Sequence, residues 1–147
     1  MPSESIERFS SIMVPVDGTH ASIEAVALAC DLARKNKGKV FVVNVIEVER
    51  MLPLEAQMES EETEGDAVLA RAEEAAKKAG YQVTGEILHA REAGPAIVDE
   101  AIERGIDLAI LGTEYREPFG QFELGKVIQY VLKNAPCEVW ICRHPTE

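Results

Sequence analysis

The residues best suited to chemistry lie in the segment Leu111–Arg143, which reads LGTEYREPFGQFELGKVIQYVLKNAPCEVWICR. Gly112 ends an apolar strand in this segment, and Gly125 stands where a helical pattern begins. That pattern runs to Asn134, and Pro136 prevents its continuation before another apolar strand. Backbone N–H groups at a helix N-terminus can hold a phosphate when a glycine-bearing loop leads into the helix. The segment therefore predicts an anion-binding loop between a strand and a helix.

A carboxylate near the other end of the chain is the second candidate. Asp17 follows the apolar run Ser11–Val16 and precedes Gly18 and Thr19. A carboxylate in this place can accept a hydrogen bond from a ribose hydroxyl, or it can cap the helix that follows. The residues alone leave both roles open.

Strand and helix patterns alternate strictly along the chain around these candidates. Continuous apolar runs indicate strands that are buried on both faces of a sheet, and apolar residues at helical spacing indicate helices between them. The predicted strands are 11–16, 39–48, 82–88, 107–111 and 138–143, and the predicted helices end near 36–38, 80, 105 and 134. This alternation favours an α/β fold, a single open five-stranded parallel sheet of order 3-2-1-4-5 with helices on both faces.

In such a sheet a ligand binds beyond the carboxyl ends of the strands, where the winding reverses between strands 1 and 4. The carboxyl end of strand 1 carries Pro15–Thr19, and that of strand 4 carries Gly112 and Thr113. Two segments far apart in the sequence are therefore expected to converge on one crevice.

Length and composition limit the class of protein. The 147 residues predict one domain, 1–147, with a flexible or loosely packed segment at 1–9. The net charge of −11, from 26 acidic against 15 basic residues, argues against binding to nucleic acid or to an anionic membrane. No apolar run approaches the roughly 20 residues that span a bilayer, and the N-terminus lacks the pattern of a secretory signal, so we expect a cytoplasmic protein. The three cysteines lack metal-ligand spacing, which favours reduced thiols and no metal site.

The two ends of the chain together resemble the universal stress protein family. Nucleotide-binding members carry the motif G-x2-G-x9-G-[S/T], and Gly112 and Gly125 fall at its first and third glycine positions. The sequence VPVDGT, which ends at Thr19, is similar to the family's N-terminal motif, whose aspartate binds the nucleotide. The chain is identified as a member of the family, with its Rossmann-like, adenine nucleotide α-hydrolase-like fold. The resemblance implies that the adenine of ATP or AMP would be held by backbone near Asn44 and Val45.

The loop departs from the family motif at two positions. Tyr115 replaces the second glycine, and its side chain obstructs the approach of backbone N–H groups to a phosphate. Lys126 replaces the Ser/Thr; like Arg116, it either pairs with phosphate as a point charge or is a solvated surface charge. Glu114 and Glu117 place negative charge beside any phosphate. The candidate nucleotide site comprises Val16, Asp17, Gly18, Thr19, Asn44, Val45, Gly112, Thr113, Tyr115, Arg116, Gly125 and Lys126.

Catalytic motifs are not apparent. His20, His89 and His144 are scattered, and the chain contains no Walker A motif, nucleophile elbow or Rossmann glycine motif. The family resemblance, together with the lack of these motifs, therefore implies a non-enzymatic stress-response or regulatory protein with a degenerate nucleotide-binding loop and no required cofactor. The alternative is an adenine-nucleotide-binding switch with at most slow ATP hydrolysis. An enzyme of the wider α-hydrolase-like group would need a pyrophosphate loop where this chain has DGTHAS.

Two further segments suggest partners. The last strand is an edge strand in the expected order, and an apolar edge invites pairing with another chain. The family commonly dimerises through this strand, so the candidate interface of a homodimer comprises Glu138, Val139, Trp140, Ile141 and Cys142; Trp140 is equally suited to the core. The segment Glu47–Glu74 holds ten acidic and two basic residues. It is either a solvated helix face or a docking surface for a basic protein partner, and Met51–Leu54 within it is expected to pack as a loop.

Overall fold

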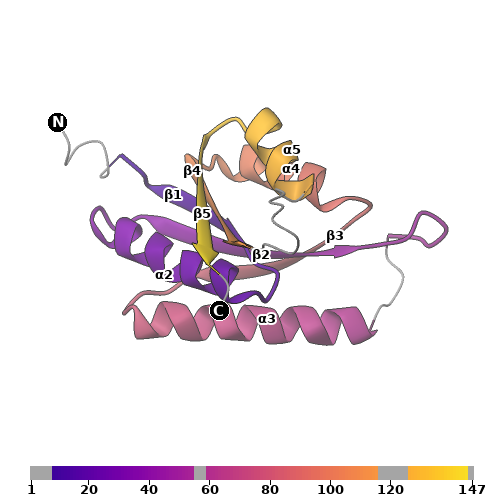
Figure 1. Cartoon of the computed structure of the whole chain (residues 1–147), viewed down its shortest axis with the longest axis horizontal. Coiled ribbons are helices and arrows are strands. Elements are labelled where there is room, and N and C mark those ends of the chain that lie inside the picture. The colour runs from indigo at the N-terminus through magenta and orange to yellow at the C-terminus, as the bar shows by residue number, and fades with distance from the viewer. Residues whose placement is uncertain (1–7, 55–58, 116–125, 146–147) are drawn as a thin grey trace.

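The computed structural model describes residues 8–54, 59–115 and 126–145. Strands and helices alternate through these residues (Figure 1). The strands are β1 (Ser11–Pro15), β2 (Lys39–Glu47), β3 (Thr84–Ala90), β4 (Leu108–Tyr115) and β5 (Glu138–Pro145). The helices are α2 (His20–Arg34), α3 (Glu59–Lys78), α4 (Ala93–Arg104) and α5 (Lys126–Asn134).

All paired strands run parallel, in the order β3-β2-β1-β4-β5. The predicted strand order is therefore confirmed. Helices α2 and α3 cover one face of the sheet, and α4 and α5 cover the other (Figure 1). The central strands bury side chains on both faces: Ile12 and Val14 pack towards α2, whereas Met13 packs into the cluster beneath α4 and α5. This burial explains why their sequences are continuously apolar rather than alternating.

Strand β3 begins two residues later than the sequence predicts. The chain leaves α3 through Gly80, which has a positive φ of 75°, and the N–H of Tyr81 then donates to the carbonyl of Ala76. The Tyr81 hydroxyl also donates to the carbonyl of Gly38. These bonds hold residue 81 in the turn, so pairing with β2 starts at Thr84 and extends to Ala90.

Strand β4 does not end at Gly112, and the prediction that it does is wrong. Pairing with β5 continues in register from Leu108 opposite Glu138 as far as Tyr115 opposite Pro145. The polar residues of this extension gave no apolar signal. Their backbone groups nevertheless join the ladder with β5, which itself runs two residues beyond the predicted end.

Phe9 corrects the expectation of a loosely packed segment at 1–9. Its side chain is 2% exposed, and its ring meets that of Trp140 edge to face at a centroid distance of 5.5 Å. The Arg8 guanidinium pairs with the Glu138 carboxylate. Residues 8 and 9 are thus fixed against β5, whereas residues 1–7 lie outside the described part of the chain.

The acidic run enters a helix, as predicted, and its side chains lie on the exposed face of α3. Gly65, Val68, Ala72 and Ala76 form the buried stripe of that helix. The preceding segment Met51–Leu54 does not pack, contrary to expectation, because Met51 is 93% exposed. Within the described residues, no helix is long and apolar enough to cross a membrane.

Candidate functional site

The turn after β1 is anchored to the neighbouring strand β2. The N–H of Val16 donates to the carbonyl of Val43 at 2.8 Å, and the Asn44 side-chain amide donates to the carbonyl of Val16 at 2.9 Å. Gly18 then turns the chain with φ 90°, a conformation that favours glycine. Strand β1 therefore ends in a fixed turn at the carboxyl edge of the sheet.

Asp17 organises this turn, but it is not the residue that caps α2. Its Oδ1 accepts from the backbone N–H of Thr19 at 3.0 Å and from the Thr19 hydroxyl at 2.7 Å. Thr19 is the N-cap, and its hydroxyl oxygen accepts from the N–H of Ser22 at 3.2 Å. The carboxylate of Asp17 is exposed and supports the cap from outside. The alternative that Asp17 itself caps the helix is therefore wrong.

Helix α3 contributes two contacts to the site that the sequence did not reveal. Arg71 donates to the carbonyl of Gly18 at 2.9 Å. Gly65 packs so closely on Asn44 that a Cβ added at Gly65 would stand only 2.8 Å from Asn44 Oδ1. Both residues sit on a helix whose sequence signal is amphipathicity alone, so only the packing of α3 on the sheet identifies them.

The end of β2 presents backbone groups to the crevice. The carbonyl of Val43 faces β1, since it accepts from Val16. Alternate residues of a strand address the same neighbour, so Val45 directs its N–H and carbonyl to the same side, beyond the end of β1 at Pro15. This is the position at which the resemblance to the universal stress protein family implies that adenine would be held.

Gly112 brings β4 against the first turn of α2. A Cβ at this position would lie 2.1 Å from the carbonyl oxygen of Ala21 and 2.9 Å from the N–H nitrogen of Ser22. The Val16–Thr19 turn leads directly into that helix, and Thr113 follows Gly112 along β4. The structure therefore brings together the two segments that the sequence placed at one crevice.

The remaining loop candidates are only partly described. Tyr115 is the last residue of β4 and Lys126 is the first of α5, but their side chains are outside the described part of the structure. Arg116 and Gly125 lie wholly outside the described residues.

Two histidines pair with glutamates, and the cysteine of α2 is buried. His20 pairs with Glu24 at 3.3 Å, and His89 pairs with Glu62 at 3.1 Å. Burial raises the pKa of the Cys30 thiol to about 11, so this group stays protonated at neutral pH. No group of three His, Cys, Asp or Glu side chains in the described ranges is arranged to hold a metal ion.

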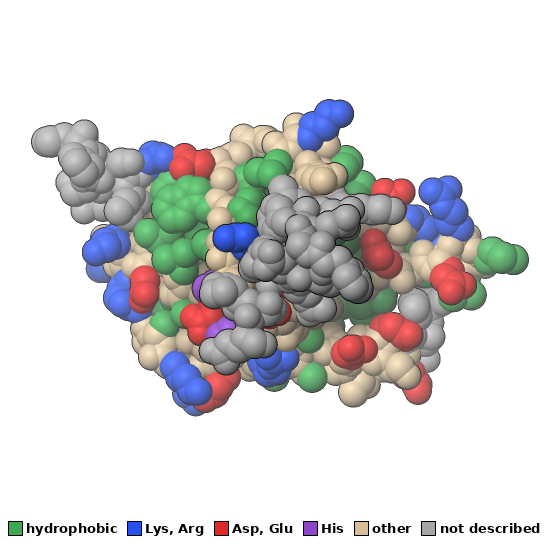
Figure 2. All heavy atoms as spheres, viewed as in Figure 1, with side chains coloured by type: hydrophobic (Ala, Val, Ile, Leu, Met, Phe, Trp, Pro, Cys, Tyr) green, Lys and Arg blue, Asp and Glu red, His purple; other side chains and the backbone are tan. Residues whose placement is uncertain are grey.

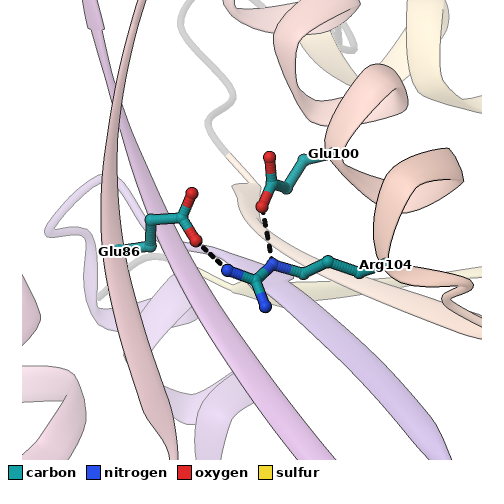
Figure 3. Close-up of polar contacts among 3 residues, drawn as sticks. All are labelled: Glu86, Glu100 and Arg104. Atoms are coloured by element: carbon teal, nitrogen blue, oxygen red, sulfur yellow. Dashed lines mark hydrogen bonds and ion pairs between the residues drawn. The ribbon is translucent and has the colours of Figure 1, made fainter.

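A second polar cluster, centred on Arg104, lies between α4 and β3 (Figure 3). Its Nε donates to Glu100 at 2.6 Å, its Nη2 pairs with Glu86, and its Cζ stands 4.5 Å from the centre of the Phe41 ring. The hydrogen bonds that Arg104 donates to Glu100 and Glu86 raise the pKa of its guanidinium. Arg104 thus clamps α4 to the sheet edge at β3, and its charge is already paired.

The architecture is that of the Rossmann-like, adenine nucleotide α-hydrolase-like proteins: a five-stranded parallel sheet of order 3-2-1-4-5, in which the winding reverses between β1 and β4. The profile of the universal stress protein family matches residues 8–143, so the chain belongs to that family.

Relatives and solved structures agree with this assignment. The chain is 28% identical over 143 residues to a universal stress protein of Methanocaldococcus jannaschii, covering 93% of this chain and 84% of that protein. A universal stress protein from Archaeoglobus fulgidus has a similar fold, with TM-score 0.75 and 22% identity over 90% of this chain and 98% of that one. A structure of an Archaeoglobus fulgidus universal stress protein in complex with dAMP gives TM-score 0.73 and 21% identity, over 90% and 97% of the two chains.

Proposed function

We propose that this chain is a non-enzymatic stress-response or regulatory protein that acts as a dimer and carries a degenerate nucleotide-binding loop. The observation that carries the proposal is the pairing of β4 with β5 beyond Gly112, as far as Tyr115. The family motif places its second glycine at position 115, in a loop that presents N–H groups to phosphate. Alternate residues of a strand bond to the same neighbour, so about half of the backbone N–H groups in this extension are directed to the ladder with β5 and are not available to a phosphate.

The surroundings of the histidines support the non-enzymatic part of the proposal. His20 and His89 each contact a glutamate rather than a hydroxyl or thiol. A general base needs a nucleophile or substrate proton within hydrogen-bond reach. The His20–Glu24 pair lies within α2, whereas the His89–Glu62 pair joins β3 to α3.

The second candidate function is an adenine-nucleotide-binding switch with at most slow ATP hydrolysis. It is favoured by the half of the crevice that the structure describes, where Val45 presents backbone groups and Asp17 an exposed carboxylate. The dAMP complex of the Archaeoglobus fulgidus protein supports it, because that protein shares the fold. ATP or AMP would be the ligand, and no metal or other cofactor is required.

Titration calorimetry with ATP and with AMP separates the two functions. We expect weak or undetectable ATP binding by the wild type, and stronger binding after Tyr115→Gly with Lys126→Ser restores the family motif. If Lys126 pairs with a phosphate, Lys126→Ser alone should weaken binding by about 1 kcal/mol, the value of one exposed charge contact.

Two variants of Asp17 test, in the same titration, whether the ligand binds beside this carboxylate. Asp17→Asn keeps an oxygen that can accept from Thr19 but removes the charge, whereas Asp17→Ala removes both. A wild-type Kd of about 1 µM or below would favour the switch, and Asp17→Ala should then abolish binding. Tight binding that survives Asp17→Ala would place the ligand outside this crevice.

We further propose that the dimer forms through β5. In the described sheet this strand pairs with β4 on one side only. The side chains of Trp140 and Cys142 pack towards α2, whereas those of Val139 and Ile141 pack towards α4 and α5. The free edge therefore offers mainly its backbone groups, which suit a ladder with the same strand of a second copy.

A further inference from the structure

The loop between β2 and α3 carries an apolar tip, Met51–Leu54, that no other described element covers. Met51 is 93% exposed, Leu52 39% and Leu54 40%, with Pro53 exposed between them. The loop projects from the end of β2, well away from the body of the sheet (Figure 1). Hydrophobic side chains are visible at its extremity (Figure 2). Exposing several large apolar side chains in one place is costly in water, and such patches mark interaction sites.

The loop is also held in a defined shape by Arg91, which lies just beyond β3. Its Nη1 donates to the carbonyl of Leu52 at 2.7 Å, to that of Val48 at 3.4 Å, and to that of Glu49. The N–H of Leu52 closes a turn by donating to the carbonyl of Glu49 at 3.0 Å. An apolar tip that is ordered before binding loses less conformational entropy when it binds.

The base of the loop is fixed as well. The side chain of Val48 is 2% exposed, and its N–H donates to the carbonyl of Ala90 at 2.8 Å. Glu47 Oε2 accepts from the N–H of Ala93 at 2.9 Å, which joins the end of β2 to the start of α4. These hydrogen bonds therefore hold the base of the loop against the sheet and the start of α4.

The charge around the tip is acidic. Exposed carboxylates flank it in the loop, in the first turn of α3 and before α4: Glu49, Glu59, Glu61 and Glu92. Two arginines of the region, Arg50, which pairs with Glu92 at 3.9 Å, and Arg91, whose guanidinium donates to carbonyl groups, offset part of this charge, but these carboxylates outnumber them. Figure 2 shows acidic side chains gathered along this end of the molecule, beneath the apolar tip.

We propose that Met51–Leu54 and the surrounding carboxylates form a docking surface for a basic, amphipathic helical segment of another protein. Methionine and leucine adapt to the apolar face of such a helix, and the carboxylates attract its lysines and arginines. A second copy of this chain fits less well, because an isologous contact would place acidic residues against acidic residues. An anionic membrane would be repelled by the same charge.

This docking surface does not depend on nucleotide binding or on pairing of β5. It also favours one of the two roles that the sequence leaves open for the acidic segment Glu47–Glu74, namely docking of a basic partner rather than a solvated helix face.

A synthetic probe tests the proposal without knowledge of the natural partner. The probe is a fluorescent peptide of about 18 residues, long enough for a stable helix, with leucines at helical spacing and lysines elsewhere. Binding is measured by fluorescence anisotropy. A scrambled peptide of the same composition, which has no apolar face, controls for charge attraction alone. Wild-type protein should bind the amphipathic peptide at least about tenfold more tightly than the scrambled one.

The tip variant Met51→Ser with Leu54→Ser should lose that preference, with binding weakened about tenfold. Both side chains are exposed, so the fold is retained. Ile102→Ser is the matched control, because Ile102 is 60% exposed on α4, away from the tip. The charge variant Glu59→Gln with Glu61→Gln should reduce the loss of affinity between about 50 and 200 mM salt.

Three outcomes would overturn the proposal. The first is equal binding of the two peptides, or equal binding by wild type and the tip variant. The second is self-association of the wild type that the tip variant abolishes, since the tip would then bind a second copy. The third is binding to zwitterionic vesicles that depends on Met51, which would make the tip a membrane contact.

Discussion

At the scale of single residues, Gly112 sets how closely β4 approaches α2. Its missing side chain leaves room for the carbonyl of Ala21, which belongs to the helix backbone and cannot rotate away. The glycine of the family motif is thus required by packing in this chain, whether or not a phosphate is bound. Asp17 has a similar double character, since it supports the Thr19 cap and still exposes a carboxylate.

Gly112→Ala should destabilise the fold strongly. The new Cβ would meet backbone at 2.1 Å, so β4 or α2 must move, at a cost of about 2 kcal/mol or more. Urea denaturation followed by circular dichroism measures the change. Gly85→Ala is the control, because a Cβ in β3 would stand 3.7 Å from Leu69 in ordinary contact. Equal stability of the two variants would contradict the packing role of Gly112.

At the scale of elements, the start of α2 depends on a short hydrogen-bonded network. Thr19 Oγ1 accepts from the N–H of Ser22 and donates to Asp17, while Ser22 Oγ donates to the carbonyl of Thr19. Ser22 is buried beside β4, so the network also fixes where the helix meets the sheet. The cap therefore connects the stability of α2 to the geometry of the crevice.

Thr19→Ala should lower the free energy of unfolding by about 1 kcal/mol, the usual cost of removing an N-cap side chain. Thr19→Ser retains the hydroxyl and should change stability by much less. Thermal and urea denaturation of both variants provide the measurement. If Thr19→Ala and Thr19→Ser are equally stable, the hydroxyl does not cap α2 in solution.

The sequence predicts the helices and strands. The errors concern features that depend on contacts between residues far apart in the chain. Apolar periodicity predicts β1 and α4, because the buried positions of these elements are occupied by apolar residues of their own sequence. The extension of β4 to Tyr115 depends on β5, some thirty residues later in register, and left no apolar signal. The exposed tip at Met51 was likewise misjudged, because an apolar residue in a loop gives no indication of whether another element covers it.

The same limit applies to the candidate site. The convergence of the Val16–Thr19 turn with Gly112 followed from strand order alone, since parallel strands end at a common edge. The contacts from Arg71 and Gly65 did not follow, because they depend on how α3 lies across the sheet. Side-chain identity also could not decide between the roles of Asp17.

At the scale of the whole molecule, the open sheet has one edge at β3 and the other at β5. A net charge of −11 makes two copies repel each other in general. Any association of two copies must then rely on short-range contacts. The backbone ladder of an edge strand supplies such contacts, since its hydrogen bonds do not depend on net charge. The N-terminal anchor of Phe9 on Trp140 keeps the indole on the α2 face, away from the free edge.

We predict that β5 pairs antiparallel with its copy across a two-fold axis, so that the wild type sediments as a dimer at tens of micromolar, about the level where interfaces of modest area persist. Val139→Lys with Ile141→Glu should yield monomer or aggregate, because charges on β5 disturb the strand that forms the ladder. Both side chains are partly buried beneath α4 and α5, so circular dichroism must show that the monomer is folded. Leu132→Lys with Ile102→Glu makes the same chemical change at two exposed positions, 49% and 60% accessible, and should leave the dimer intact. A wild-type monomer at this concentration, or a dimer lost equally in both double variants, would show that β5 is not the interface.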